Sequence, residues 1–366
     1  MLTRSELIPP CAGPRTGRGR AAAGTDRPRG RRDDRAAPKA PPEARPRGAS
    51  PRLDLVRALF IVNPQATTTT PRSRDILVGA LGREMELDVA HTEYRDHARE
   101  LARQAAGEGY GLVISLGGDG TVNEVVNGLL ATPEDLERPS YAALPGGSAN
   151  VFVRALGHPT DPVEATAAVL EAARGGEGRS VGLGRLRSDE DDRYFTFCAG
   201  FGWDADVVHE VDRQRRSGRR ASPGLYISIA LKLFLRGDAN VPSLSIEAPG
   251  RDPVRDLYFA LVTNTTPWTY AGSVPVQPTP RSRFGLGLDL FALTQLRTAR
   301  TAQLLRRMLS HRGVPPVGAG YVSWHDQSAI TITSRTPRAF QIDGEYLGHR
   351  RRVNLESVPK ALRIIG

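Results

Sequence analysis

The stretch from Leu112 to Leu130, LVISLGGDGTVNEVVNGLL, decides the fold, because it runs from an apolar segment through a glycine turn into a helical pattern. Val113, Ile114 and Leu116 form a run typical of a parallel strand that is covered on both faces. Beyond the turn, apolar side chains recur at the spacing of one helix face. These side chains are Val122, Val125, Val126, Leu129 and Leu130. The stretch predicts a strand, a turn and a helix of an α/β fold.

The turn itself has the layout of a phosphate-binding loop. Gly117, Gly118 and Gly120 allow the backbone to approach a ligand closely. The free amides at the start of the new helix favour anions. Asp119 lies in the middle of the turn, where a carboxylate would repel phosphate, so it indicates a bound cation or a proton-accepting role. A purely structural turn between strand and helix is the alternative.

Two further segments repeat this arrangement. ALFIVNP at 58–64 and YAALPGGSANVFVRALG at 141–157 each place an apolar strand before a loop. Between them we expect a helix at 71–82, a strand at 86–91 and a second helix at 95–107. Ligands of open α/β sheets bind beyond the carboxyl ends of the strands. The three loops therefore predict a nucleotide site at one edge of a parallel sheet.

The pattern changes after about residue 178. Short segments of alternating polarity are separated there by Gly, Pro, Asp and Asn, as in an antiparallel β-sandwich. The expected strands are 180–187, 193–199, 243–248, 255–263, 287–294, 329–334, 338–342 and 351–356. The expected helices are 203–216, 222–236 and 297–312.

Most of the net charge of +10 belongs to one end of the 366-residue chain. Residues 1–52 carry 13 Arg or Lys and 5 Asp or Glu, which leaves a net charge of only +2 for the rest. This segment has too few apolar residues to bury a core, and we expect it to be a disordered tail. Because the remainder has no basic stripe with interleaved aromatic residues, nucleic acid is not an expected partner.

The two cysteines, Cys11 and Cys198, are isolated thiols without a CxxC spacing. They favour a cytosolic protein and argue against a disulfide framework and a structural zinc site. No apolar run reaches the roughly 20 residues of a membrane span. No apolar core of a secretory signal follows Met1.

The three loops resemble the motifs of the diacylglycerol kinase catalytic-domain family, bacterial lipid kinases related to sphingosine kinases and, more distantly, to NAD kinases and phosphofructokinases. The family motifs appear as NPQAT at 63–67, GGDGTVNE at 117–124 and LPGGSANVFVR at 144–154. The resemblance implies nucleotide contacts from these motifs and from the end of the second strand. The implied residues are Asn63, Pro64, Gln65, Ala66, Thr67, Thr92, Gly117, Gly118, Asp119, Gly120, Thr121, Val122, Asn123, Gly147 and Ser148.

A fourth family motif, Asp-Gly-Glu, occurs at 343–345. The resemblance implies that Glu345 is the general base on the lipid hydroxyl, with Asp119 as the second catalytic residue. Read by itself, this segment is an ordinary hairpin turn. The segment GFGWDADVVHE at 200–210 resembles the start of the lipid domain, and it implies that Asp206, or second Asp204, lies near the polar head of the acceptor. Carboxylates favoured by a helix N-terminus are the alternative.

Two positions depart from the family pattern. Many members carry Asp after the Asn of the third motif, where this chain has Val151. Many members also have an Asp-Gly turn that helps to hold a structural magnesium ion. This chain reads RFGLGLDLF at 283–291, with Gly285 and Leu286 at the candidate positions and only Asp289 nearby. The metal is therefore expected at Asp119, as Mg-ATP, and a second magnesium site at Asp289 is in doubt.

The resemblance implies an α/β ATP-binding domain at 53–178 and a β-sandwich lipid-substrate domain at 179–349, with 350–366 packing back on the first. ATP and Mg²⁺ are the implied cofactors. The implied reaction is phosphorylation of a lipid hydroxyl, foremost diacylglycerol to phosphatidic acid in phospholipid biosynthesis. The alternatives are a long-chain-base or other lipid-alcohol kinase, a soluble-substrate kinase similar to NAD kinases, and a nucleotide-binding module without catalysis.

A basic cluster precedes the apolar segment LYISIALKLFLR at 225–236. Such a cluster is expected to attract anionic phospholipid headgroups, so the sequence predicts a cytoplasmic, peripherally membrane-associated enzyme. The cluster comprises Arg213, Arg215, Arg216, Arg219 and Arg220. Packing of the apolar segment inside the lipid domain is the alternative. A homodimer is left open.

Overall fold

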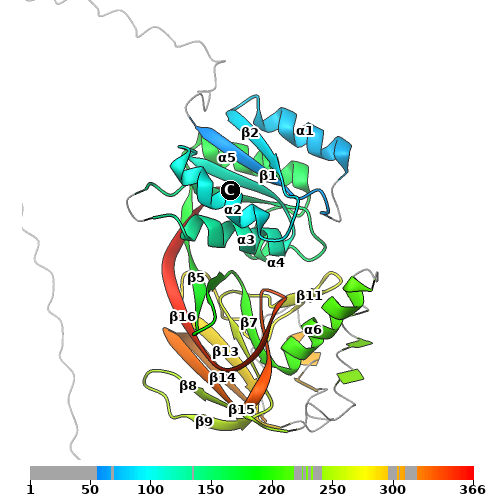
Figure 1. Ribbon diagram of the computed structural model, residues 1–366, viewed down its shortest axis with the longest axis vertical. Helices are drawn as coiled ribbons and strands as arrows, with labels where there is room; N and C mark the ends of the chain where they lie inside the picture. The colour runs from blue at the N-terminus through cyan, green and yellow to red at the C-terminus, as the bar shows by residue number, and fades with distance from the viewer. Residues whose placement is uncertain are drawn as a thin grey trace, which may run out of the picture. The chain divides into compact units, whose positions relative to one another are not determined.

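The computed structural model describes residues 56–66, 70–133, 136–217, 241–295 and 320–366, with a few positions between 225 and 233 and between 303 and 309 (Figure 1). The described residues all belong to one compact unit of the chain, Ala49–Gly366. The expected tail at 1–52, Thr67, Arg219 and Arg220 lie outside the described residues. So does most of the apolar segment 225–236.

The first part of this unit is a parallel sheet. Its strands are β1 (Arg57–Val62), β2 (Glu86–His91), β3 (Leu112–Gly117) and β4 (Ser140–Pro145), in the order β4-β3-β1-β2. All three neighbouring pairs are parallel. Every residue of β3 is buried, as the continuous apolar run predicts.

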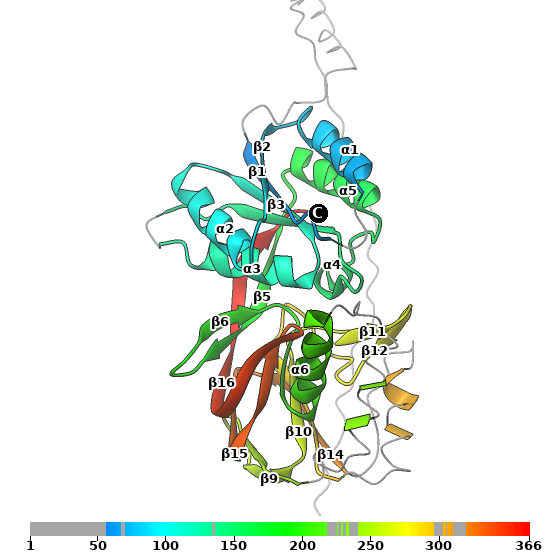
Figure 2. The same cartoon turned by 45° about the vertical axis from the view of Figure 1, so that its right-hand side comes forward.

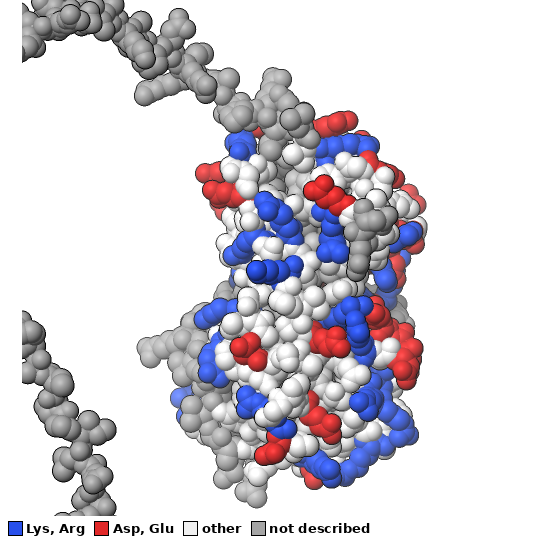
Figure 3. All heavy atoms as spheres, turned by 90° about the vertical axis from the view of Figure 1, so that its left-hand side faces the viewer, with Lys and Arg blue, Asp and Glu red and all other residues white. Residues whose placement is uncertain are grey.

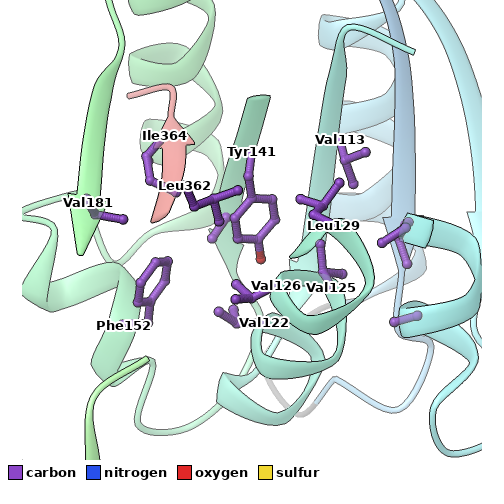
Figure 4. Packing of buried hydrophobic residues seen from close by; sticks show 14 of the residues in the cluster. Val113, Val122, Val125, Val126, Leu129, Tyr141, Phe152, Val181, Leu362 and Ile364 are labelled. Atoms are coloured by element: carbon purple, nitrogen blue, oxygen red, sulfur yellow. The ribbon is translucent and has the colours of Figure 1, made fainter. Parts of the chain in front are cut away.

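Helices cover both faces of this sheet. They are α1 (Pro71–Leu81), α2 (His97–Gly107), α3 (Asp119–Leu130), α4 (Val151–Ala155) and α5 (Pro162–Arg174). Apolar residues of α2, α3 and α4 share one core with β1, β3 and β4, while α1 and α5 pack in a second core on the opposite face. Figure 4 shows the first core, in which Tyr141 and Phe152 lie near the valines of α3. The helix expected from residue 95 begins at His97, because Asp96 has a φ of 66° and cannot continue a helix.

Among the described residues, the second part contains antiparallel strands and the helix α6 (Trp203–Arg216), which packs on β7, β15 and β16 (Figure 2). The strands are β5 (Arg179–Arg187), β6 (Asp192–Phe195), β7 (Cys198–Gly202), β8 (Leu244–Glu247), β9 (Val254–Leu257), β10 (Phe259–Thr263), β11 (Thr269–Ala271), β12 (Val274–Val276), β13 (Leu288–Leu293), β14 (Tyr321–Gln327), β15 (Ala329–Ile342) and β16 (Glu345–Ile364). In the described part of the chain, no helix is long and apolar enough to cross a membrane.

The long strands β15 and β16 pass between two layers. Residues 331–334 of β15 pair with β8, whereas residues 340–342 pair with β7. Between them the register with β16 shifts, between Thr333 and Arg338. Side chains of β7, β10 and β13 share one core with side chains of β5, β6 and β8. The fold is therefore α/β with a C-terminal β-sandwich, and β15 forms the corner between its layers.

The end of β16 joins the antiparallel strands to the parallel sheet. Ile364 pairs in parallel with Tyr141 of β4 and antiparallel with Arg179 of β5. Figure 4 shows Leu362 and Ile364 beside Tyr141. Residues 354–358 of β16 pair instead with residues 183–187 of β5. The hydrogen-bonded sheet therefore continues from β14 to β2 through β16.

Charged side chains of both signs are interspersed on the face in Figure 3. Residues 53–366 have a net charge of only +2, so this mixture follows from the sequence.

Candidate functional site

Three loops meet at the carboxyl edge of the parallel sheet. Asn63, directly after β1, donates from Nδ2 to Thr121 Oγ1 at 3.0 Å, and its own Oδ1 accepts from the Gln65 amide at 2.9 Å. The Gly146 amide after β4 donates to the carbonyl of Gly117 at 2.8 Å. The first and third predicted motifs are thereby both hydrogen-bonded to the second.

The glycines allow the second and third loops to touch through their backbones. A Cβ atom on Gly147 would lie 2.6 Å from the Cα of Gly118, and one on Gly117 would lie 2.5 Å from Thr121. Asn150, with a φ of 48°, closes the third loop by accepting from the amide of Gly147 and donating to its carbonyl. The glycines therefore bring backbone donors together, as an anion site requires.

The other predicted nucleotide residues lie around this contact. Pro64, Gln65 and Ser148 are exposed, whereas Ala66, Thr92 and Gly147 are half-buried. The amide of Thr92 donates to the carbonyl of Val62, which fixes it beside the end of β1. Of the remaining predicted residues, Gly120 is exposed and Gly118 half-buried. Val122 is buried in the core, so only its backbone can face a ligand.

Asp119 is the first residue of α3 and lies between the second and third loops. Its Oδ1 accepts from the amide of Phe152 in α4 at 3.1 Å. Burial raises the pKa of Asp119 to about 6, although the amides of Phe152 and Val151 partly oppose this shift. A carboxylate that is partly stripped of water next to backbone donors has an affinity for a cation or a proton.

Asn123 connects the glycine motif to a residue 220 positions away. Its Nδ2 donates to Asp343 Oδ2 at 2.8 Å and to the carbonyl of Tyr194 at 3.1 Å. Its Oδ1 accepts from the guanidinium of Arg193. The helix that follows the phosphate loop is thereby fixed to the turn between β15 and β16.

That turn consists of Asp343 and Gly344, whose φ angles are 48° and 78°. Two central residues with positive φ are the signature of a tight hairpin turn with Asp-Gly at its centre. The Asp343 carboxylate is buried, and it also accepts from the amides of Thr196, Phe197 and Cys198 and from the Thr196 hydroxyl. Burial raises the pKa of Asp343, and these donors oppose the shift. Asp343 is an anchor for the turn.

Glu345 follows immediately, and its carboxylate pairs with Arg193 through Oε2 and with Arg95 through Oε1. Arg193 belongs to β6, and Arg95 precedes α2. Glu345 is thus held at the same end of α3 as Asn123, in a partly exposed position. The predicted base and the predicted phosphate loops are joined through Arg193 and Asn123.

The two predicted acceptor carboxylates lie at the start of α6. Asp204 is buried, and its Oδ2 accepts from Gln341 Nε2 at 2.8 Å. Gln341 in turn accepts from the amide of Gly344 at 2.8 Å, so Asp204 is connected to the turn at Asp343 and Gly344. Burial raises the pKa of Asp204 to about 6. Asp206 is half-buried and interacts electrostatically with Tyr346, the residue after Glu345.

Asp289 lies elsewhere, on β13. Both its carboxylate oxygens lie within 2.9 Å of His325 Nδ1, and Oδ1 also accepts from the amide of Asp326. Among the described residues, no three His, Cys, Asp or Glu side chains lie close enough together to hold a metal ion. The carboxylate of Asp289 is thus bound by His325 and Asp326, and its role as a metal ligand stays a prediction.

The residues near the glycine turn offer Mg²⁺ a single carboxylate ligand. Asp119 supplies one carboxylate, and Val151 packs against Phe197 and Cys198 without adding a second. Mg²⁺ in kinases is commonly bound by one or two carboxylates, water and the nucleotide phosphates. The donor set suits an ion that arrives with a nucleotide better than an ion held by protein alone.

Sequence reasoning missed Arg193, Arg95 and Gln341. Arg193 lies in a short alternating strand and Arg95 in a turn, where an arginine normally indicates a solvated surface. Only the position of Gln341, two residues before the Asp-Gly-Glu motif, could have drawn attention to it. All three contact a predicted site residue or its turn.

Residues 57–185, from β1 to β5, match the family model described as Diacylglycerol kinase catalytic domain. The parallel sheet and its glycine loops thus form the catalytic part of a kinase that acts on lipids. These residues therefore carry a diacylglycerol kinase catalytic domain, and the chain is a lipid kinase.

Relatives extend the similarity beyond the matched residues. A diacylglycerol kinase of Bacillus subtilis is 27% identical over 257 residues, which cover 69% of this chain and 76% of the relative. One from Staphylococcus saprophyticus is 29% identical over 305 residues, covering 80% of this chain and 90% of the relative. A crystal structure of a diacylglycerol kinase from Bacillus anthracis shares the fold, with a TM-score of 0.60 at 20% identity over 84% of this chain and 96% of the other.

Proposed function

We propose that this lipid kinase transfers the γ-phosphoryl group of ATP to the hydroxyl of diacylglycerol, producing phosphatidic acid. The observation that carries the proposal is the hydrogen bond between Asn123 and Asp343, because it ties the Glu345 turn to the helix that the glycine motif begins. A phosphate site and a carboxylate base on adjoining elements are what phosphoryl transfer to an alcohol requires.

The nucleotide is proposed to lie on the three loops at the sheet edge. Backbone amides of the glycine turn and of the α3 N-terminus would receive its phosphates. Ser148 and the loop from Asn63 to Ala66 are exposed or half-buried and available for contact. Asp119 would hold Mg²⁺ that comes with ATP, and that ion supplies neutralisation of phosphate charge.

The acceptor is proposed to approach Glu345. Its hydroxyl oxygen attacks the γ-phosphorus, the bond from that phosphorus to the bridging oxygen of ADP breaks, and the Glu345 carboxylate takes the hydroxyl proton. Asp206, or Asp204 through the Gln341 contact, would orient the polar head. Catalysis then rests on positioning and electrostatics.

The remaining expectations stay part of the proposal. Residues 53–178 would bind ATP, and residues 179–349 would bind the lipid. Of residues 350–366, which were expected to pack back on the first domain, those from Val358 onward share its core, whereas Val353 and Leu355 lie in the core of the β-sandwich. The enzyme would act in the cytoplasm at the surface of an anionic membrane, in phospholipid biosynthesis. A homodimer is compatible with this arrangement.

A phosphorylation assay with labelled ATP and Mg²⁺ tests the proposal. The acceptors are diacylglycerol, a long-chain base and an undecaprenol-like alcohol, each in mixed vesicles, and NAD in solution. We expect label in phosphatidic acid, identified by mass. Label in another lipid would change the acceptor, and label in NAD alone would overturn the lipid assignment. ATP binding without transfer to any acceptor would indicate a nucleotide-binding module.

A further inference from the structure

We propose that Arg193 is a positioning residue that holds Glu345 by one oxygen, Oε2, and leaves Oε1 to accept the proton of the acceptor hydroxyl. This inference rests on the proposed function, because it assumes that Glu345 is the base. It concerns a residue that no predicted motif contains.

Arg193 is well placed to fix another side chain, because it is itself fixed. Only 15% of its side chain is exposed. Its Nε and Nη2 donate to Asn123 Oδ1 at 3.1 and 2.6 Å, and Nη2 also contacts Glu345 Oε2. One planar guanidinium therefore bridges the helix after the phosphate loop and the base, and a planar fork of donors suits this task.

The backbone beside Arg193 is held as firmly. The amide of Tyr194 donates to Asn127 Oδ1 at 2.8 Å, and its carbonyl accepts from the side-chain amides of Asn123 and Asn127. Asn127 also donates to Asn123. Strand β6 is thus attached to α3 at the residue next to Arg193. This attachment fixes the position of Arg193 relative to α3.

The two oxygens of Glu345 have different surroundings. Oε2 contacts Arg193, which is mostly buried, whereas Oε1 contacts Arg95, whose side chain is 62% exposed. An exposed ion pair contributes little and exchanges readily with water. An acceptor hydroxyl can therefore displace Arg95 from Oε1, but it cannot readily displace Arg193 from Oε2.

Charged groups of both signs surround Glu345 and Arg193. They are Arg95, Asp96 and Arg99 near the start of α2, Glu124 of α3, and Asp343 of the turn. Burial lowers the pKa of Arg193, and Asp343 and Asp96 oppose this shift. Arginine remains cationic at physiological pH, so its contact favours the ionised carboxylate.

The test compares Arg193→Gln with a matched control in the same hairpin. Arg185→Gln removes an ion pair between Arg185 and Asp192, 2.6 Å apart, and the cation–π contact of Arg185 with the Tyr194 ring. For Arg193→Gln we expect kcat to fall about tenfold to a hundredfold with the KM for ATP unchanged within about twofold. Arg185→Gln should leave both quantities unchanged.

Two further variants separate positioning from other roles. In a Glu345→Gln background, Arg193→Gln should cost less than about a further twofold, because its effect passes through Glu345. Arg95→Ala should keep at least about half of kcat, since it frees Oε1. Thermal unfolding shows whether Arg193→Gln is folded. If it is not, Arg193→Lys replaces it in the same comparisons.

Each opposite result overturns the inference. An increased KM for ATP with unchanged kcat would make Arg193 a nucleotide contact. Full additivity with Glu345→Gln would make it a scaffold residue. If Arg95→Ala lowered kcat as much as Arg193→Gln, the proposal that Oε1 accepts the proton while Oε2 is held would be contradicted. Full activity of Glu345→Gln alone would instead refute the proposed base, which is a separate failure.

Discussion

Asp119 places a negative charge beside loops whose backbone favours anions. Its Oδ1 already accepts from the Phe152 amide, and an asparagine oxygen could keep that bond. We therefore expect Asp119→Asn to fold normally while kcat falls by several orders of magnitude, since the charge that balances Mg²⁺ and the nucleotide is lost. Steady-state kinetics and thermal unfolding check this. A variant that keeps more than about a tenth of kcat would contradict the role.

Asp119 should also affect the pH dependence of kcat/KM for ATP. Because the pKa of Asp119 is raised to about 6, the carboxylate takes up a proton as the pH falls through that value. The kcat/KM for ATP, which reports on the free enzyme, should decline below about pH 6. This limb should be missing from the residual activity of Asp119→Asn.

At the residue scale, the sequence motifs predicted the residues that form tight turns of the backbone. The glycines, Asn63 and the Asp-Gly-Glu turn could be recognised because a tight turn permits few residue types. Arg193 could not, because an arginine in a short strand has the same pattern whether it bridges two site residues or faces water. Its role depends on Asn123 and Glu345, which lie 70 and 152 positions away.

The contact between the second and third loops belongs to the element scale. Gly147→Ala would place a methyl group 2.6 Å from the Cα of Gly118, whereas at Gly120 nothing lies within 4 Å. We expect Gly147→Ala to lower the melting temperature by several degrees and to raise the KM for ATP, because the loops must separate. Gly120→Ala, in a helix, should keep or raise the melting temperature. Equal melting temperatures for the two variants would mean that the loops do not constrain each other.

The buried carboxylate of Asp204, at the start of α6, lowers the stability of the folded protein when it is ionised. The pKa of buried Asp204 is raised to about 6, whereas in an unfolded chain it is near 4, so the folded state binds the proton more strongly. The free energy of unfolding must then fall as pH rises between these values, by on the order of 2 to 3 kcal/mol. Asp204→Asn can still accept from Gln341, and it should be more stable than the wild type at pH 7.5 but not at pH 4. Chemical denaturation at both pH values measures the difference, and a variant less stable at pH 7.5 would contradict this account.

Element types followed from sequence periods better than element ends did. The buried run of β3 and the apolar face of α3 were predicted and are observed. The predicted start of α2, at residue 95, was wrong because Asp96 adopts a left-handed conformation, which a helical pattern does not reveal. The segments 329–334 and 338–342 are one strand, because the polar residues between them form the corner of the sandwich and do not end the strand.

At the scale of the whole molecule, a lipid kinase must reach a membrane. Arg213 pairs with Glu210 in α6, Arg215 and Arg216 are the last residues of that helix, and Arg219 and Arg220 lie outside the described residues. Each basic residue near anionic lipid contributes about 1 kcal/mol, so replacing all five by glutamine should greatly weaken vesicle binding and make the remainder insensitive to salt. Sedimentation with phosphatidylglycerol vesicles at low and high salt measures both effects. Unchanged binding would assign the segment 225–236 to the core.

The central claim is that Glu345, brought to the phosphate loops by the contacts of Asn123 and Arg193, accepts the proton of a lipid hydroxyl. The most direct measurement is the kcat of Glu345→Gln with diacylglycerol vesicles, beside the affinity of the same protein for ATP. We expect kcat to fall about 10²- to 10⁴-fold while the affinity for ATP stays nearly unchanged. An unchanged kcat, or a parallel loss of ATP binding, would contradict the claim and place the base elsewhere.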